Sequence, residues 1–507
     1  MKKTQKVLAL VLALLMVAIS LAACAKGEGG DTTPAATTAV NGEQGNTPEQ
    51  TTGTAETEAP KNEYGITIVP DDLPESADLQ NRDFTVHTRG NVERYEWLAT
   101  EETGETLNDA IYRRNTRIED RFKIKINVIA EGSWKDYADN LVKVKGSISS
   151  GDGAYDLLAG YSTPASSLAT TGLILNLNDV NYINFEKPWW SDDFYKTFTI
   201  GNKTYFGIGS LSTSMLYSME CIFVNTAILK EVDENYNIYS KVDNFEWTWD
   251  EMNRVGALAY YDANGNQVAD YGDRFGYASC EHNSNPIYGF LYATGVKMVT
   301  RDETDTPVLY DDYNRLVAIG EKIIEIFFNT PTNYSYDNST VLKFEDGNVL
   351  FLHHWLYGGQ TKYSKTMDEY GIVPIPLFDS DQKKYATPIQ GGMHMYCIPI
   401  DVKNIDDDAM IVEALAAESY HSLMPAYYEV ALKTRYVKDA DTSRMIDIMY
   451  DNLNFDFGYV YNSTIQYLNS FSAMVTSKRA GTSAINSAFR TSKRLLDDLV
   501  KNIQEAH

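Results

Sequence analysis

Apolar and polar positions alternate in the order strand, helix, strand, helix, strand near the start of the predicted folded part. Residues 83–88 alternate as a half-buried strand does, and Leu107, Ile111, Ile118 and Phe122 form one stripe of a helix. The order then continues with a strand over 123–129, a helix from Trp134 towards Val144 capped by Ser133, and a strand over 155–159. This order predicts an α/β fold with a parallel sheet covered by helices.

A second set of elements follows less regularly. It comprises strands at 220–225, 348–353 and 393–399, a helix after Thr248, an amphipathic helix over 312–328, and mostly helices from residue 406 onward. A chain that builds one α/β unit, leaves it and returns through residues 371–376 predicts two lobes joined by several crossings. Sheets of this kind bind ligands beyond the carboxyl ends of their strands, which are the loops 87–97 and 160–164 in the first unit.

The N-terminus has the three parts of an export signal. Three lysines precede an uninterrupted apolar stretch over residues 7–19, which is followed by Ser20-Leu21-Ala22-Ala23-Cys24. Leu-Ala-Ala-Cys resembles the bacterial lipobox, and this resemblance implies cleavage after a signal peptide of residues 1–23 and a diacylated Cys24. The alternative is an ordinary secretory signal with a chance cysteine.

A polar segment separates Cys24 from the predicted folded part. Residues 24–63 are rich in Thr, Gly and Glu and contain no aromatic side chain. Such a composition cannot bury enough apolar surface to fold, so we expect a disordered tether. No second apolar stretch of spanning length follows, which leaves lipid as the expected membrane attachment.

The charge and cysteine content exclude several classes. The chain has 70 acidic and 44 basic residues, three of them lysines of the signal peptide, so the mature chain has a formal charge of 41 − 70 = −29. This charge argues against nucleic acid as a partner. Cys221, Cys280 and Cys397 have no spacing typical of a metal site or a disulfide framework, and buried free thiols are expected.

The order of short motifs resembles the extracellular solute-binding proteins of ABC importers, in particular the carbohydrate-type group that is similar to maltose-binding protein. The motifs are Leu107-Asn108-Asp109-Ala110-Ile111-Tyr112 with Arg114-Asn115, Tyr155-Asp156-Leu157-Leu158, Leu168-Ala169, Gly172-Leu173-Ile174, Leu177-Asn178-Asp179, Lys187-Pro188-Trp189-Trp190, Phe223-Val224-Asn225, Trp247-Thr248-Trp249-Asp250 and Phe344-Glu345-Asp346-Gly347.

The resemblance implies a periplasmic-binding-protein clamp in which each lobe is a mainly parallel sheet flanked by helices. Its ligand would lie in the cleft, and hinge closure would present the loaded form to permease subunits in the membrane. We expect a first lobe over 64–218, a second over 219–375, and a return crossing with a helical C-terminal part over 376–507. The expected protein is a monomer and a binding protein rather than an enzyme.

The aromatic content favours a glycan as the ligand. A sugar ring presents apolar C–H faces and a rim of hydroxyls, so its site needs flat aromatic platforms together with planar donors and acceptors. The chain has seven Trp and 35 Tyr. We therefore expect an oligosaccharide or a related glycan.

The resemblance places two candidate ligand contacts at the ends of strands. Trp355 follows the strand after a Phe-x-x-Gly turn, where maltose-type proteins carry a sugar-stacking tryptophan, although the spacing here is shorter. Tyr161 and Ser162 follow the third strand, where the same proteins place an aromatic ring and polar groups. The alternatives are a core tryptophan and a surface turn.

Further candidates lie on the loop after the first strand and at a crossing. Glu93 and Arg94 could grip hydroxyls bidentately beside Trp97, although a solvated charge cluster is the alternative. Asn225, at the end of the crossing strand, is a candidate hinge residue or ligand contact.

The loop 262–273 is a candidate calcium site. Its ligands by EF-hand-like spacing would be Asp262, Asn264, Asn266, the Val268 carbonyl, Asp270 and Asp273. Gln267 replaces the glycine of that pattern and Asp273 replaces the bidentate glutamate, and a plain Asn-Gly turn is the alternative. No other cofactor is expected. His353 and His354 point to opposite faces of a strand, which disfavours a shared metal.

Two other functions remain open at this stage. A glycosidase needs a pair of carboxylates across a cleft, and nothing in the sequence marks out such a pair. A sensory or adhesive lipoprotein could use the same clamp, and the sequence does not separate it from an importer component.

Overall fold

The computed structural model describes residues 60–92, 95–133, 135–279, 285–334, 344–435 and 439–506. The predicted signal peptide, Cys24 and most of the predicted tether lie outside the described residues. The end of the tether was placed a few residues too late. Asn62 Nδ2 donates to the His421 carbonyl at 2.6 Å, and Lys61 forms a bridge with Thr67, so the fold begins before Tyr64.

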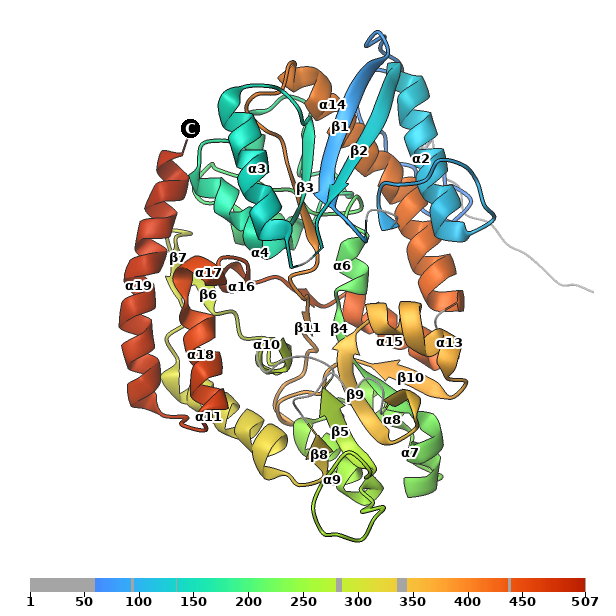
Figure 1. The fold of residues 1–507 in the computed structure, drawn as a ribbon, viewed down its shortest axis with the longest axis vertical. Helices are drawn as coiled ribbons and strands as arrows, with labels where there is room; N and C mark the ends of the chain where they lie inside the picture. The colour runs from blue at the N-terminus through green and yellow to red at the C-terminus, as the bar shows by residue number, and fades with distance from the viewer. Residues whose placement is uncertain are drawn as a thin grey trace, which may run out of the picture. The chain divides into compact units, whose positions relative to one another are not determined.

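The first sheet has the strand order β12-β3-β1-β2. Its strands are β1 (Arg82–Arg89), β2 (Ile124–Glu131), β3 (Leu157–Tyr161) and β12 (His394–Cys397). β1 pairs in parallel with β2 and β3, and β12 joins β3 in antiparallel orientation after a long excursion of the chain. Helix α2 (Thr106–Phe122) lies beside α14 (Ile405–Glu418) (Figure 1).

The predicted βαβαβ order is present, with one helix start displaced. Helix α3 covers Tyr137–Ser150 and has Asp136 as its N-cap residue. Ser133 instead accepts a hydrogen bond from the Lys135 amide and donates to Asp136, which makes a turn ahead of the helix. The predicted start, Trp134, lies outside the described residues.

The second sheet has the order β10-β4-β9-β5-β8. Its strands are β4 (Glu220–Asn225), β5 (Phe275–Ser279), β8 (Asn333–Tyr334), β9 (Val349–Trp355) and β10 (Tyr370–Val373). β4 runs antiparallel to both β9 and β10, whereas β5 is parallel to β9 and β8. Strands β10, β9, β5 and β8 therefore run in the same direction, so the expectation of a mainly parallel sheet holds for this lobe, with the reversed strand β4 as the exception.

Helices connect and cover the two sheets. Those before β10, besides α2 and α3, are α4 (Ser162–Ala165), α5 (Asp192–Phe198), α6 (Ser214–Tyr217), α7 (Thr226–Val232), α8 (Ile238–Asp243), α9 (Trp249–Ala259), α10 (Asn285–Ala293), α11 (Tyr313–Ile324) and α13 (Ser364–Thr366). Those after it, besides α14, are α15 (Ala440–Tyr450), α16 (Phe457–Val460), α17 (Asn462–Ile465), α18 (Tyr467–Thr476) and α19 (Thr482–Glu505). Two short ribbons, β6 (Val299–Arg301) with β7 (Pro307–Leu309) and β11 (Thr387–Pro388) with β13 (Leu453–Asn454), complete the fold.

Local sequence signals explain several boundaries. Thr248 Oγ1 accepts the Glu251 amide at 3.2 Å and begins α9, as the sequence predicts. α11 begins after Asp312, whose side chain accepts the Arg315 amide, and continues as a π-helical turn over Glu325–Asn329. Cys221 and Cys397 are buried free thiols, as expected, and Cys280 lies outside the described residues.

The C-terminal helices pack along both lobes, and the Tyr205 hydroxyl of the first lobe donates to the Ala506 carbonyl at 2.9 Å. Helix α19 contacts α18, α11 and β7 (Figure 1). Within the described residues, every helix is too short or too polar to cross a bilayer.

Candidate functional site

Three tyrosine rings join the ends of the two sheets. Tyr95 follows β1, Tyr217 ends α6 just before β4, and Tyr357 follows β9. The ring centroids lie 5.9 Å apart for Tyr95 and Tyr217, 6.2 Å for Tyr95 and Tyr357, and 5.7 Å for Tyr217 and Tyr357. Tyr95 and Tyr357 are partly exposed, whereas Tyr217 is buried. Segments that leave different sheets therefore meet through aromatic faces and edges, and we name this region the aromatic junction.

Trp355 extends the aromatic junction at the end of β9. Its ring lies near parallel to that of Tyr357, at 6.3 Å and 30°, and it is partly exposed. The strand register places Trp355 opposite Glu220, the first residue of β4. The residue thus lies where the second sheet ends and has accessible ring surface, which is the placement that the sequence predicts for a stacking tryptophan.

Tyr161 occupies the corresponding position at the end of β3. Its ring is partly exposed, and the Arg89 guanidinium lies over it with Cζ at 4.7 Å from the ring centroid. Tyr137 of α3 packs against its edge at 6.1 Å. Tyr161 also contributes to the raised pKa of Tyr459, whose principal cause is burial, so these two tyrosines are neighbours.

Tyr459 brings a third part of the chain to the same region. Its ring lies 6.0 Å from Tyr288 and 5.9 Å from Tyr292, both on α10, and its hydroxyl accepts the Gly391 amide at 2.8 Å. Glu220 also raises the pKa of Tyr459, which places that carboxylate nearby.

Two buried carboxylates near the junction are paired with histidines. Glu220 Oε2 lies 3.0 Å from His353 Nε2, and both side chains are 4 % exposed. Gly289 of α10 permits this pair, because a Cβ there would clash with the Glu220 carboxylate and the His353 ring. His354 makes a different contact, from Nδ1 to the Trp355 carbonyl at 2.9 Å, and burial lowers the pKa of its imidazole to about 4.

The second pair lies under the first sheet. Glu96 Oε2 lies 2.6 Å from His394 Nδ1 and accepts the Tyr396 hydroxyl at 3.0 Å, while Oε1 accepts the Ser214 amide. Burial raises the pKa of Glu96, but the His394 charge and these hydrogen bonds outweigh burial, so the pKa lies below its usual value. Both side chains are fully buried, which indicates a structural brace.

Three sequence candidates prove to be structural in this conformation. Trp97 is 1 % exposed and packs between the Arg114 guanidinium at 4.8 Å and the Tyr396 ring at 6.0 Å. Ser162 is fully buried and donates to the Gly391 carbonyl at 2.9 Å. Asn225 is 4 % exposed and its side chain accepts the Ile228 amide at 3.1 Å as the N-cap of α7.

A strand end predicts proximity to the site but not side-chain direction, so ligand contact by these three residues stays a prediction, and the N-cap role of Asn225 is compatible with the hinge position that the sequence also suggests. The charged candidates Glu93 and Arg94 lie outside the described residues. Arg89, Tyr95, Tyr217, Tyr357 and Tyr459 were missed. The sequence signal for these residues is their position within or beside the predicted loops and crossings. Hydrophobic periodicity does not distinguish a side chain that contacts a ligand there from one that packs in the core.

The candidate calcium loop is held by its own hydrogen bonds. Asp262 accepts the amides of Gly265 and Gln267, at 2.7 and 2.8 Å. Asn264 Nδ2 and Asn266 Nδ2 both donate to Asp270 Oδ2, and Asp273 accepts the amides of Ala263 and Asp270. Across the described part of the chain, no group of three or more His, Cys, Asp or Glu side chains is arranged to hold a metal ion. The calcium site stays a prediction of the sequence pattern, and the loop's own hydrogen bonds favour the alternative of a plain Asn-Gly turn.

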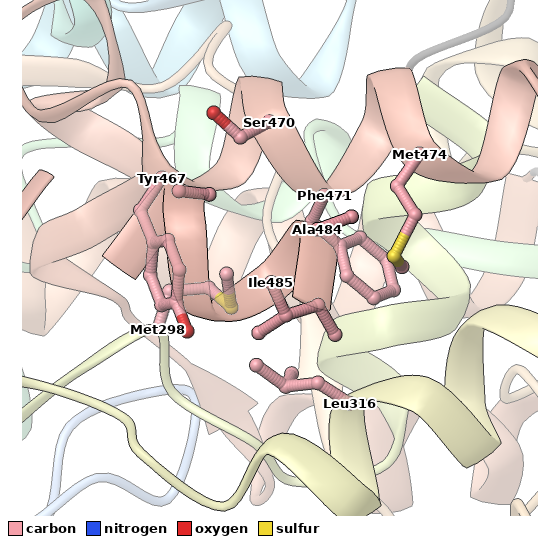
Figure 2. A pocket seen from close by; sticks show the side chains of 9 residues that line it. Met298, Leu316, Tyr467, Ser470, Phe471, Met474, Ala484 and Ile485 are labelled. Atoms are coloured by element: carbon pink, nitrogen blue, oxygen red, sulfur yellow. The ribbon is translucent and has the colours of Figure 1, made fainter. Parts of the chain in front are cut away.

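Two cavities lie away from the aromatic junction. One, of about 40 Å³, is lined by side chains from α11, α18 and α19, and Figure 2 shows Leu316, Phe471 and Ile485 converging on it. Its apolar lining and small volume indicate a packing defect of the C-terminal helices. The other, of about 310 Å³, is a groove lined by Leu141, Val142, Lys145, Thr163, Pro164 and Ser463, among others.

A family model for bacterial extracellular solute-binding proteins matches residues 116–410. A comparison with curated protein sequences finds no match. Among solved structures, the galacto-N-biose/lacto-N-biose I-binding protein of an ABC transporter from Bifidobacterium longum, in complex with lacto-N-biose, is 12% identical with a TM-score of 0.54. This alignment covers 85% of this chain and 99% of that protein.

Two further structures give similar values. An ABC transporter solute-binding protein from Thermotoga lettingae TMO bound with α-D-tagatose is 15% identical, with a TM-score of 0.52 and coverage of 82% of this chain and 100% of its own. A cyclic α-maltosyl-1,6-maltose-binding protein from Arthrobacter globiformis is 14% identical, with a TM-score of 0.50 and coverage of 83% and 99%. At these identities the likeness establishes the two-lobed periplasmic-binding-protein fold.

Proposed function

Because this chain belongs to the bacterial extracellular solute-binding proteins, we propose that it captures an oligosaccharide or related glycan and delivers it to an ABC importer by hinge closure. The family consists of binding proteins that act outside the cytoplasm, and this chain is a binding protein rather than an enzyme.

The observation that carries the proposal is the aromatic junction, together with the nearby rings of Tyr161 and Tyr459. Tyr95, Tyr161, Trp355, Tyr357 and Tyr459 are all partly exposed, and they follow or approach the strand ends of both sheets. Partly exposed rings from two lobes offer faces on either side of a flat ligand, and a sugar ring has the apolar C–H faces that such rings bind. Closure of one lobe on the other would then complete the site.

The solved structures with the same fold support a glycan ligand. Those from Bifidobacterium longum and Thermotoga lettingae are complexes with lacto-N-biose and α-D-tagatose, and both proteins belong to ABC transporters. A shared fold does not determine which ligand is bound. The specific saccharide therefore depends on the side chains of this chain's own site.

The anchor and partners complete the proposal. Diacylation of Cys24 would hold a monomer at the outer face of the cell membrane, and the polar segment after it would let the folded part reach two permease subunits. Tethering of this kind raises the local concentration of loaded protein near the importer. The same tether would serve a sensory protein equally well. We propose import because the solved structures of the same fold belong to ABC transporters.

Thermal unfolding against a ligand panel tests the proposal. Residues 60–507 would be heated with neutral and acidic oligosaccharides, peptides and amino acids. A saccharide at 100 times its Kd stabilises the folded form by about 2.7 kcal/mol and raises the midpoint. A panel in which peptides or amino acids shift the midpoint and no saccharide does would contradict the glycan assignment. We expect the saccharides to be recovered unchanged after the assay, because a binding protein does not hydrolyse its ligand.

A further inference from the structure

Arg89 is a buried cation without an anionic partner in the described part of the protein. It ends β1, is 7 % exposed, and none of the described Asp or Glu side chains forms an ion pair with it. Arg114, the other buried arginine, is satisfied in a different way. Its Nη2 donates to the Glu96 carbonyl at 2.5 Å and to Asn115 Oδ1 at 2.8 Å.

The groups around Arg89 are aromatic. Its guanidinium lies over the Tyr161 ring and beside Tyr217. Burial raises the pKa of Tyr217, and the Glu96 charge raises it further, while Arg89 only partly opposes them, so the phenol is neutral at physiological pH. The Tyr217 hydroxyl is buried and makes no hydrogen bond of normal geometry within the described residues. A neutral phenol and a π face orient the guanidinium but do not neutralise it.

Two nearby carboxylates are already engaged, and a third, Glu131, lies opposite Arg89 in the strand register but is exposed and forms no ion pair with it. Glu220 is paired with His353, and Glu96 with His394, Tyr396 and the Ser214 amide. Neither is available to Arg89 without breaking a buried pair. A buried charge that lacks a counter-charge is costly, and such groups are retained where a ligand supplies the missing charge.

The geometry points to a saccharide that carries a carboxylate, such as a uronic acid or a sialic acid, as the ligand class of this site. We propose that its carboxylate pairs with Arg89 in the bidentate manner that a planar guanidinium favours, with the Tyr217 hydroxyl as a further donor. The sugar rings would lie against Tyr161 and the rest of the aromatic junction. This inference rests on the proposed function, because it specifies the glycan bound at that junction.

The overall charge of the chain favours a carboxylate over more highly charged groups. A formal charge of −29 on the mature chain repels anions at a distance, and a phosphate monoester, with a charge of about −1.5 to −2, is repelled more strongly than a single carboxylate. The Arg89 guanidinium lies over the Tyr161 ring and beside Tyr217, and at short range its own charge outweighs the distant acidic residues, so one carboxylate can be recognised locally.

Matched ligand pairs test the inference. Titration calorimetry would compare oligogalacturonates, glucuronate disaccharides and sialyllactose with their neutral methyl esters, which keep the rings and hydroxyls but remove the charge. Galactose 6-phosphate serves as the alternative anion. For at least one pair, the acid is expected to bind at least about tenfold more tightly than its ester, which corresponds to about 1.4 kcal/mol.

Variants assign this preference to Arg89. Arg89→Gln should bring the acid-to-ester ratio close to one, Arg89→Lys should give an intermediate ratio, and Arg490→Gln, an exposed change of the same charge, should leave the ratio unaltered. Should Arg89→Gln not fold, the acid-to-ester ratio of the wild-type protein remains decisive. If saccharides bind and no acid exceeds its ester, or if the phosphate binds best, the carboxylate assignment is overturned and the glycan proposal stands. If no saccharide binds, both fail.

Discussion

The rings of Tyr95 and Tyr357 meet edge to face, with centroids 6.2 Å apart and ring planes at 89°. Tyr95 lies just beyond β1 of the first sheet, and Tyr357 lies just beyond β9 of the second. Edge-to-face pairs contribute about 0.5–1.5 kcal/mol beyond the area they bury. A contact of this size can be exchanged for contacts with a ligand, which suits a clamp that opens and closes.

Trp355→Ala should abolish detectable saccharide binding with little effect on the free protein. The indole is partly exposed, and within the described residues its ring contacts are with Tyr357 and His354, so its removal leaves no large cavity. We expect a loss of at least about tenfold in affinity, equal to about 1.4 kcal/mol. Calorimetric titration with the best saccharide of the panel gives the affinity, and thermal unfolding gives the midpoint. A drop of many degrees in the unliganded midpoint would show that Trp355 is a core residue.

Trp97→Ala is expected to show the opposite behaviour. Trp97 is 1 % exposed, and its removal leaves a cavity beside Arg114 and Tyr396. Substitutions of this kind cost about 3–5 kcal/mol of folding free energy. Urea unfolding measures this loss. A stability unchanged within about 1 kcal/mol, together with lost saccharide binding, would restore Trp97 as a ligand contact.

Stability should fall as pH rises from about 4.5 to about 7 because of Glu413. Burial raises the pKa of Glu413 to about 7, although the indoles of Trp189 and Trp190 donate to its carboxylate at 2.8 Å and partly oppose that rise. The unfolded chain releases this proton near pH 4.5, so the folded protein holds more protons in that interval and loses stability with increasing pH, by at most about 3 kcal/mol.

Glu413→Gln should therefore reduce this slope. The amide keeps an acceptor for one indole and cannot ionise. Urea unfolding at pH 5, 6, 7 and 8 measures the slope, with the exposed substitution Glu303→Gln as the matched control. Asp408 and Asp456, whose pKa values burial raises to about 7 and about 6, contribute in the same direction and remain in both variants. Identical slopes for wild type and Glu413→Gln would refute the assignment.

Chelation of calcium should leave the thermal midpoint unchanged within about one degree. The carboxylates of the loop 262–273 accept hydrogen bonds from the loop's own amide groups, so folding of the loop does not require a bound ion. Differential scanning calorimetry with added calcium and with chelator makes the comparison. A calcium-dependent rise of several degrees that Asp262→Ala removes would instead establish the site that the sequence pattern suggests.

The sequence predicts the strand and helix order of the first lobe because period-two and period-3.6 patterns are strong there, as in residues 83–88 and the stripe through Ile111. It does not predict the reversed direction of β4 in the second sheet, since that direction depends on which strands β4 meets. Trp97 and Trp355 have the same chemistry and similar positions after strands, yet one is core and the other is partly exposed. The burial of Trp97 results from its packing against Arg114, and no local sequence pattern indicates that contact.

A crystal structure with the best-binding saccharide tests the central claim most directly. The ligand should contact Trp355 from the second lobe and Tyr161 from the first in the same molecule, with its rings against the aromatic junction. A saccharide that contacts only one lobe, or that lies in the groove lined by Leu141, Val142 and Thr163, would contradict the account.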